Sequence, residues 1–127
     1  MESADPALTI CARGLSRRFG NHVAVKALDL DVRRGEVLGL LGPNGAGKTT
    51  TMQMLTGNLA PTTGAIRICD VDLLENPATA KARIGYLPET PPLYKELTVA
   101  EYLRLAARLH RVPRAECAGA VNSAMAR

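Results

Sequence analysis

The fold of this 127-residue chain is decided by one stretch, Gly42-Pro43-Asn44-Gly45-Ala46-Gly47-Lys48-Thr49-Thr50. Residues 42–49 match the pattern GxxxxGK[ST], in which glycines let successive backbone N–H groups curl around a phosphate chain. A continuous apolar run, Val37 to Leu41, comes directly before it and predicts a short strand buried on both faces. A helix is expected directly after it, ending near Gly57. This context predicts a nucleoside triphosphate site rather than a chance glycine turn.

Two side chains of the loop carry the expected chemistry. Lys48 supplies a mobile positive charge for the β- and γ-phosphates, and the Thr49 hydroxyl is a hard oxygen ligand suited to Mg²⁺. The N-terminus of the following helix adds the positive end of its dipole. We expect Lys48 to stabilise charge and position, as phosphoryl transfer requires, and not to act as a nucleophile.

The rest of the chain alternates strand and helix signals. Before the loop, Leu8 to Leu15 and Val23 to Val32 predict two strands, and the turn at Gly20-Asn21-His22 predicts that they pair as a hairpin. After the loop we expect strands at Ile66 to Cys69 and Ile84 to Leu87, and helices that begin near Pro77, Thr98 and Arg114. Thr98 and Glu101 have the spacing of a capping box. The pattern is typical of an α/β sheet.

Composition excludes several classes of protein. With 46% apolar residues the chain has enough material for a core, and its length alone suggests one compact unit. It has no apolar run long enough to span a membrane, and its acidic, polar start is not a secretory signal. The net charge is +4, but the basic residues are not interleaved with aromatic residues as they are in proteins that bind single-stranded nucleic acid. No nucleic acid is therefore expected as a partner. Four arginines at helical spacing are interpreted as a solvated helix face: Arg104, Arg108, Arg111 and Arg114.

The exact residues resemble a known family. Residues 42–50 are similar to the Walker A loop of ABC-type ATPases, and residues 33–41 and 59–64 resemble the segments that flank that loop. Ile84-Gly85-Tyr86-Leu87-Pro88-Glu89, followed by Leu93-Tyr94 and by residues 97–103, resembles the Q-loop region of these proteins. The resemblance covers about residues 8–110, and Leu87-Pro88-Glu89 looks like the exporter branch of the family.

The resemblance implies ATP and Mg²⁺ as cofactors. Phe19 takes the position of the aromatic ring that stacks on adenine, with a plain core phenylalanine as the alternative. Glu89 stands where the family usually has Gln, and it implies a contact with Mg²⁺ and the attacking water; the alternative is a surface loop residue. Lys48 and Glu89 are then the catalytic residues, and Thr49 and Glu89 the metal ligands. The implied nucleotide-binding residues are Phe19, Gly42, Asn44, Gly45, Ala46, Gly47, Lys48, Thr49 and Thr50.

The implied fold class is α/β, a P-loop NTPase (ABC ATPase) core preceded by an antiparallel β-hairpin and incomplete at the C-terminus. Residues 1–127 are expected to be the N-terminal portion of a nucleotide-binding domain, because the signature segment, the Walker B strand with its Asp-Glu end and the switch histidine are absent from them. The chain alone is therefore not expected to hydrolyse ATP. Val37 to Leu41 and the helix from Arg114 are expected to expose apolar faces, which predicts poor solubility or aggregation of the isolated chain.

The expected function is ATP binding within an ABC transporter ATPase subunit that couples hydrolysis to transmembrane transport, with export favoured. Expected partners are a membrane permease, for which Arg104 and Arg108 are docking candidates, and a second nucleotide-binding subunit. The expected location is cytoplasmic, peripheral to the inner face of the plasma membrane. Two alternatives stay open: a nucleotide-binding fragment without activity, and a soluble ABC ATPase of DNA repair or translation. A GTPase or a small kinase fits the loop but not the segments around it, and no guanine-reading Asn-Lys-x-Asp segment is present.

Overall fold

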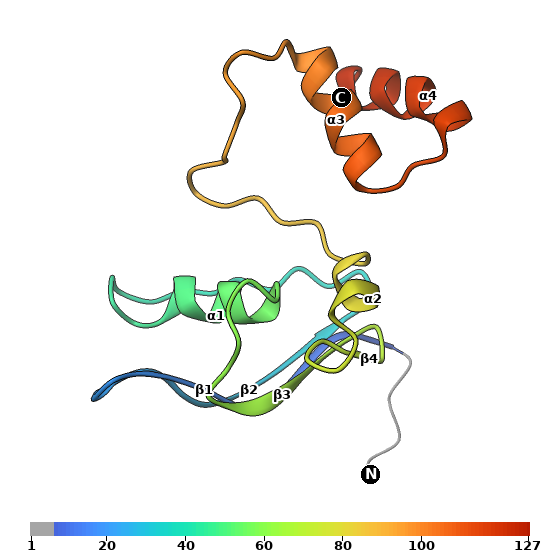
Figure 1. Cartoon of the computed structure of the whole chain (residues 1–127). Helices are drawn as coiled ribbons and strands as arrows, with labels where there is room; N and C mark the ends of the chain where they lie inside the picture. Colours follow the sequence, from blue (N-terminus) through green and yellow to red (C-terminus); the bar gives the residue numbers. More distant parts are fainter. Residues whose placement is uncertain (1–6) are drawn as a thin grey trace. The chain divides into compact units, whose positions relative to one another are not determined.

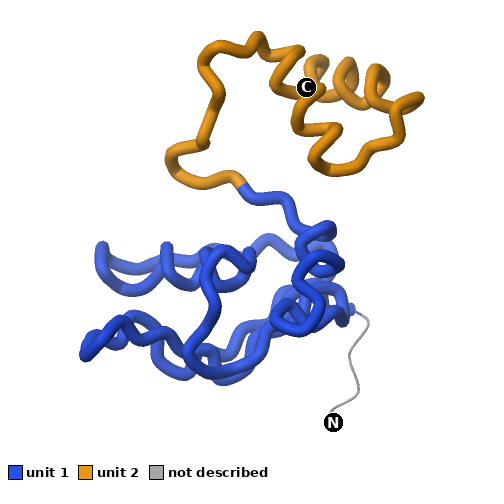
Figure 2. Tube along the Cα trace, in the orientation of Figure 1, with its two compact units in different colours: residues 1–86 blue, residues 87–127 orange. Residues whose placement is uncertain are grey.

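The computed structural model describes residues 7–127, which fall into two compact units (Figure 2). The first unit ends at Tyr86, and the second runs from Leu87 to Arg127. The single unit suggested by length is therefore not found. Between Ile84 and Thr98 the chain contains no helix or strand, and this long irregular stretch separates the two units along the sequence.

An antiparallel sheet forms the base of the first unit (Figure 1). Its strands are β1 (Leu8–Phe19), β2 (His22–Arg33), β3 (Thr63–Ile68) and β4 (Val71–Asp72), in the order β2-β1-β3-β4. The predicted hairpin is confirmed, since β1 pairs antiparallel with β2 and Phe19 faces His22 across the turn. Beyond β3, Cys69 and Asp70 have positive φ angles, and this tight turn adds the short strand β4 that the sequence did not predict.

Two helices lie on one side of this sheet, α1 (Lys48–Leu55) and α2 (Pro77–Lys81) (Figure 1). Both were predicted, and α1 ends at Leu55, with Thr56 as its C-cap before Gly57, whose φ of 72° suits only glycine well. The helices and the sheet share one core of buried side chains. It consists of Ala12, Leu15, Val25, Met54, Leu55, Ile66, Ile68, Leu73 and Ala80.

Two predicted strands do not form. Val37 to Leu41 is extended without ladder pairing, with Val37 97% and Leu41 93% exposed, and Ile84 to Leu87 is irregular as well. A strand exists only when a neighbour hydrogen-bonds to it, and no strand among residues 7–127 lies beside either segment. The two apolar runs are not paired with a strand in the described residues, and the expected exposure of residues 37–41 is confirmed.

The second unit contains two helices, α3 (Val99–Leu109) and α4 (Arg114–Met125), which pack against each other. The predicted capping box is confirmed, because Thr98 Oγ1 accepts from Glu101 N at 3.3 Å and Thr98 N donates to Glu101 Oε2 at 2.8 Å. Arg111, with a φ of 56°, turns the chain between the helices. No helix in residues 7–127 is both long enough and apolar enough to cross a membrane.

Candidate functional site

The loop before α1 is shaped by glycines with positive φ angles. Gly45 has a φ of 84° and Gly47 a φ of 90°, a region in which other residues are strained. A Cβ atom at Gly47 would lie 2.4 Å from the carbonyl oxygen of Ala24 and 3.1 Å from a methyl of Val25. The loop is therefore seated against β2 so closely that only glycine fits at position 47, and β2 fixes where α1 begins.

The N-terminus of α1 presents free donors to the loop. By helix geometry, the first N–H groups of α1 have no partner four residues earlier, whereas Thr51 N donates to Gly47 O at 2.8 Å. Thr51 itself is buried, which fixes the first turn to the core. The free N–H groups and the helix dipole make this end of α1 suited to an anion.

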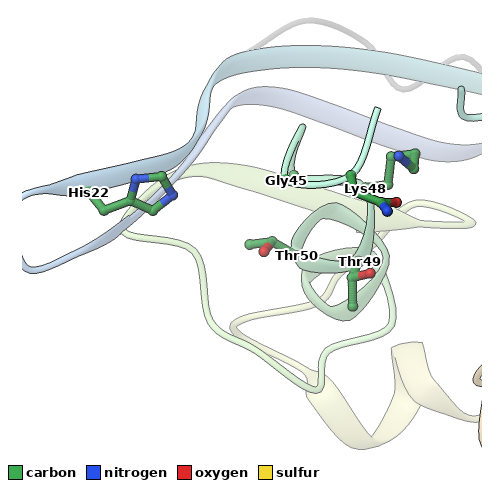
Figure 3. A pocket seen from close by; sticks show the side chains of 7 residues that line it. His22, Gly45, Lys48, Thr49 and Thr50 are labelled. Atoms are coloured by element: carbon green, nitrogen blue, oxygen red, sulfur yellow. The ribbon is translucent and has the colours of Figure 1, made fainter. Parts of the chain in front are cut away.

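A cavity of about 270 Å³ opens at this point. Its size suits a phosphate chain better than a whole nucleotide, since sites for drug-sized ligands usually measure about 300–1,000 Å³. Figure 3 shows that its lining comes from the loop, the first turn of α1 and the β1–β2 hairpin. The lining residues are His22, Asn44, Gly45, Gly47, Lys48, Thr49 and Thr50. Six of the seven are predicted site residues, whereas Gly42 and Ala46 shape the loop without lining the cavity.

Lys48 folds back onto its own loop. Its Nζ donates to the carbonyl oxygen of Pro43 at 2.7 Å and also to that of Gly42. The ammonium group is thus held at the loop by neutral acceptors. Phosphate oxygens carry full charge and form stronger hydrogen bonds with an ammonium group than carbonyls do, so an entering phosphate would draw Lys48 from these carbonyls.

His22 is the lining residue that the sequence reasoning missed. Gly20-Asn21-His22 was interpreted only as a turn, yet the structure places the His22 imidazole at the hairpin side of the cavity, on the side of Thr50 (Figure 3). One signal was available. A two-residue turn sets its flanking residues opposite each other, so expecting Phe19 near a nucleotide implied His22 nearby as well.

Phe19 does not line this cavity. Its ring is 45% exposed, and the guanidinium carbon of Arg17 lies 4.6 Å from the ring centroid. Arg17 is held there by a hydrogen bond from Nη1 to the carbonyl oxygen of Ala60, at 2.8 Å. The alternative of a plain core phenylalanine is excluded by this exposure, and stacking on adenine stays a prediction.

Glu89 belongs to the second unit and lies in the irregular stretch before α3. Its side chain is exposed. The expected contact of Glu89 with a metal ion stays a prediction, as does the metal-ligand role of Thr49, which lines the cavity in the first unit.

Comparison with known proteins gives consistent matches. The family model described as ABC transporter matches residues 25–126. The chain is 43% identical over 93 residues to the probable multidrug ABC transporter ATP-binding protein YbhF of Escherichia coli (strain K12), covering 73% of this chain and 16% of that protein. It is 39% identical over 106 residues to the Nod factor export ATP-binding protein I of Ralstonia nicotianae, covering 84% of this chain and 33% of that protein.

A solved structure described as the ATP binding subunit of an ABC transporter superposes on this chain with a TM-score of 0.77 at 39% identity. The match covers 85% of this chain and 45% of that one. The chain therefore spans less than half of the length of each of these similar proteins. The expected P-loop fold class is confirmed by this superposition, although two of the predicted strands are unformed here.

Proposed function

The chain belongs to the ABC transporter family of ATP-binding proteins, and on this premise we propose that it binds ATP with Mg²⁺ in the cavity of residues 44–50. The observation that carries the proposal is the seat of the loop on β2, with Gly47 held against Ala24 and Lys48 poised on carbonyls that a phosphate can replace. In the complete protein, this binding would serve an ATPase subunit that couples hydrolysis to transmembrane transport.

The residues present fit the phosphate chain. The free N–H groups at the start of α1 would bind phosphate oxygens, Lys48 would bind the β- and γ-phosphates, and Thr50 would donate to the α-phosphate. Phe19 would stack on the base, and its flat ring would accept any purine. The chain thus supplies a phosphate cradle whose shape is fixed before the ligand arrives.

Thr49 Oγ1 is the hard oxygen that would hold Mg²⁺, and Glu89 is a second candidate ligand. A bound Mg²⁺ ion supplies charge neutralisation at the phosphate oxygens. Glu89 differs from the glutamine usual in the family by its negative charge. We assign Glu89 the role that glutamine has in the family, which is to position the metal ion and the attacking water. Its negative charge would repel a nearby phosphate, which a neutral glutamine would not.

Hydrolysis by these 127 residues alone is not part of the proposal. No run of four apolar residues followed by Asp-Glu occurs in them, so they offer no Walker B carboxylates to hold the metal and orient a water. We propose that these residues bind ATP and show no measurable steady-state turnover on their own. The alternative of a nucleotide-binding fragment without activity of its own is therefore compatible with the proposed function.

Export is the direction that the relatives' names favour, because those proteins are described as multidrug and Nod factor export ATP-binding proteins. The proposed partners are a membrane permease and a second nucleotide-binding subunit, at the cytoplasmic face of the plasma membrane. Transport is favoured over DNA repair or translation for the same reason.

The test is binding of a fluorescent ATP analogue with Mg²⁺ to the 127-residue chain and to its Lys48→Ala variant. Loss of a charged hydrogen-bond donor predicts binding weaker by at least about tenfold in the variant. Lys95→Ala in the second unit is the matched control and should bind like the parent. Equal binding by the parent and Lys48→Ala would refute the site, and measurable steady-state ATPase activity of the chain would refute the inactivity.

The role of Glu89 is tested in a longer family member that carries this segment together with the signature and Walker B motifs. Glu89→Ala should lower transport-coupled ATPase activity there, while Glu89→Gln should retain it. Unchanged turnover in the alanine variant would leave Glu89 as a surface residue.

A further inference from the structure

A cleft of about 530 Å³ lies between α3 and α4 in the second unit, and none of its lining residues is assigned to ATP. Arg104 and Arg108 stand one turn apart on α3, and Arg114 is the first residue of α4. The two helices thus contribute three arginines to the lining of one cleft. The lining consists of Arg104, Arg108, Val112, Arg114, Cys117 and Ala118.

No carboxylate lines this cleft, and none of its three arginines forms an ion pair with another residue of the 7–127 range. Arg104 contributes to holding the pKa of Glu101 below its ordinary value, but the Thr98 cap is the larger cause. The Glu101 carboxylate accepts from Thr98 N and Oγ1 at 2.8 and 2.7 Å, so it is already bound at the start of α3. Within the lining of the cleft, no negatively charged side chain balances the three arginines.

This arrangement is costly for a plain solvated face. Like charges four residues apart on a helix, as at Arg104 and Arg108, destabilise it, and Arg114 adds a third charge at the mouth of the same cleft. A helix N-terminus also favours negative charge over positive charge, and the first turn of α4 carries Arg114 together with Glu116. An anion in the cleft would reduce the repulsion among the three arginines.

The local backbone favours the same ligand. At the start of α4, the N–H groups of Glu116 and Cys117 both donate to Pro113 O, at 2.8 and 3.1 Å, while those of Arg114 and Ala115 have no partner four residues earlier by helix geometry. Cys117 Sγ donates to Val112 O at 3.4 Å, which fixes the turn at the base of the cleft. The start of α4 therefore supplies free N–H donors at Arg114, a residue that also lines the cleft.

We propose that the α3–α4 cleft binds a small phosphate-bearing anion, with two linked phosphate groups the best match. Each guanidinium is a planar fork suited to two oxygens of a phosphate, and two linked phosphate groups offer more oxygens to three forks than one phosphate group does. The volume is that of a small-molecule site. This site is separate from the ATP cavity in residues and in unit, and it stands or falls independently of it.

The test is calorimetric titration of inorganic pyrophosphate into the full 127-residue chain carrying Lys48→Ala, which removes the phosphate-binding lysine of the other cavity. Pyrophosphate should bind this protein, and adding Arg108→Gln should weaken binding about tenfold. Arg111→Asn is the matched control, because it removes the same charge nearby from a residue outside the cleft, and asparagine tolerates the positive φ at that position. Arg111→Asn should change pyrophosphate binding by less than about twofold, because it reduces only the long-range electrostatic attraction of the protein for the anion.

Arg104→Gln provides a second variant, checked by far-ultraviolet circular dichroism so that loss of α3 is not mistaken for loss of a contact. An equal loss in Arg108→Gln and Arg111→Asn would overturn the proposal, since it would reveal only nonspecific attraction. Absence of pyrophosphate binding to the Lys48→Ala chain would overturn it as well. Neither result would bear on ATP binding, which is measured in the chain with Lys48 intact.

Discussion

The two units of this chain are stabilised in different ways. The first buries nine apolar side chains between its sheet and its helices, whereas Val121 is the buried residue of the second within the described range. The second unit instead depends on local devices, a capping box at Thr98 and a turn at Arg111 between two short helices. The loop that we propose to hold phosphates in fixed geometry is seated on the packed unit. Substitutions should therefore cost most beside β2 and least in the second unit.

The largest effect is expected from Gly47→Ala. The new Cβ would meet Ala24 O at 2.4 Å while the backbone is held at a φ of 90°, so strain and overpacking add. We expect a loss of about 4 kcal/mol in unfolding free energy, measured by urea denaturation, together with loss of ATP binding.

Gly45→Ala is the control for that experiment. Its φ of 84° is similar, but nothing lies within 4 Å of the added Cβ, so only the backbone strain is incurred. A cost of about 1–2 kcal/mol is expected. If both variants lost the same unfolding free energy, the close approach of the loop to β2 would not be what holds the loop in place.

A second comparison sets the two cores against each other. Met54 is fully buried in the first unit, and Met54→Ala should cost about 3 kcal/mol. Val121→Ala removes less buried surface and should cost about 1.5 kcal/mol, seen in α3–α4 melting rather than in the sheet. Denaturation followed by hydrogen exchange reports the two units separately. Equal costs would show that the second unit has a core as firm as that of the first.

Local signals in the sequence predicted most of the elements. The hairpin, α1 and the capped start of α3 depend on turns, glycines and caps a few residues away, and all three are confirmed. Val37 to Leu41 was predicted as a strand from its apolar run, yet strand formation depends on a partner that no local pattern reveals. The division at Tyr86 was missed for a related reason, since length says nothing about where contacts thin out.

The candidate site shows the same limit. The GxxxxGK[ST] pattern predicted the loop residues that line the cavity, because the pattern specifies the spacing of these residues directly. His22 lies outside that pattern and far before it in the sequence, and its place at the cavity follows from how the hairpin is set against α1. That placement depends on the buried contacts of Val25 and Met54, which the sequence shows as apolar without showing what they touch.

A smaller effect is expected from Thr98→Ala, which removes the cap of α3 and should cost that helix about 1 kcal/mol. The cap also lowers the pKa of Glu101 below its ordinary value of 4.5. Because the folded pKa is the lower one, the stabilisation by Glu101 is complete above that value and is lost as pH falls through the folded pKa. Helicity of the parent should fall on acidification below about pH 4.5, and that of Thr98→Ala should fall less. Identical acid titrations, followed by circular dichroism, would contradict the role of the cap.

The smallest effect concerns His22. Its imidazole lines the phosphate cavity from the hairpin, so His22→Ala should weaken binding of a fluorescent ATP analogue about threefold, far less than Lys48→Ala. Asn21→Ala, one residue away in the same turn and outside the lining, should leave affinity unchanged. Phe19→Ala completes the comparison, because Phe19 faces His22 across the turn but does not line the cavity. If Phe19→Ala weakened binding while His22→Ala did not, the hairpin would contact the base but not the phosphates. The phosphates would then be held only by the loop and α1.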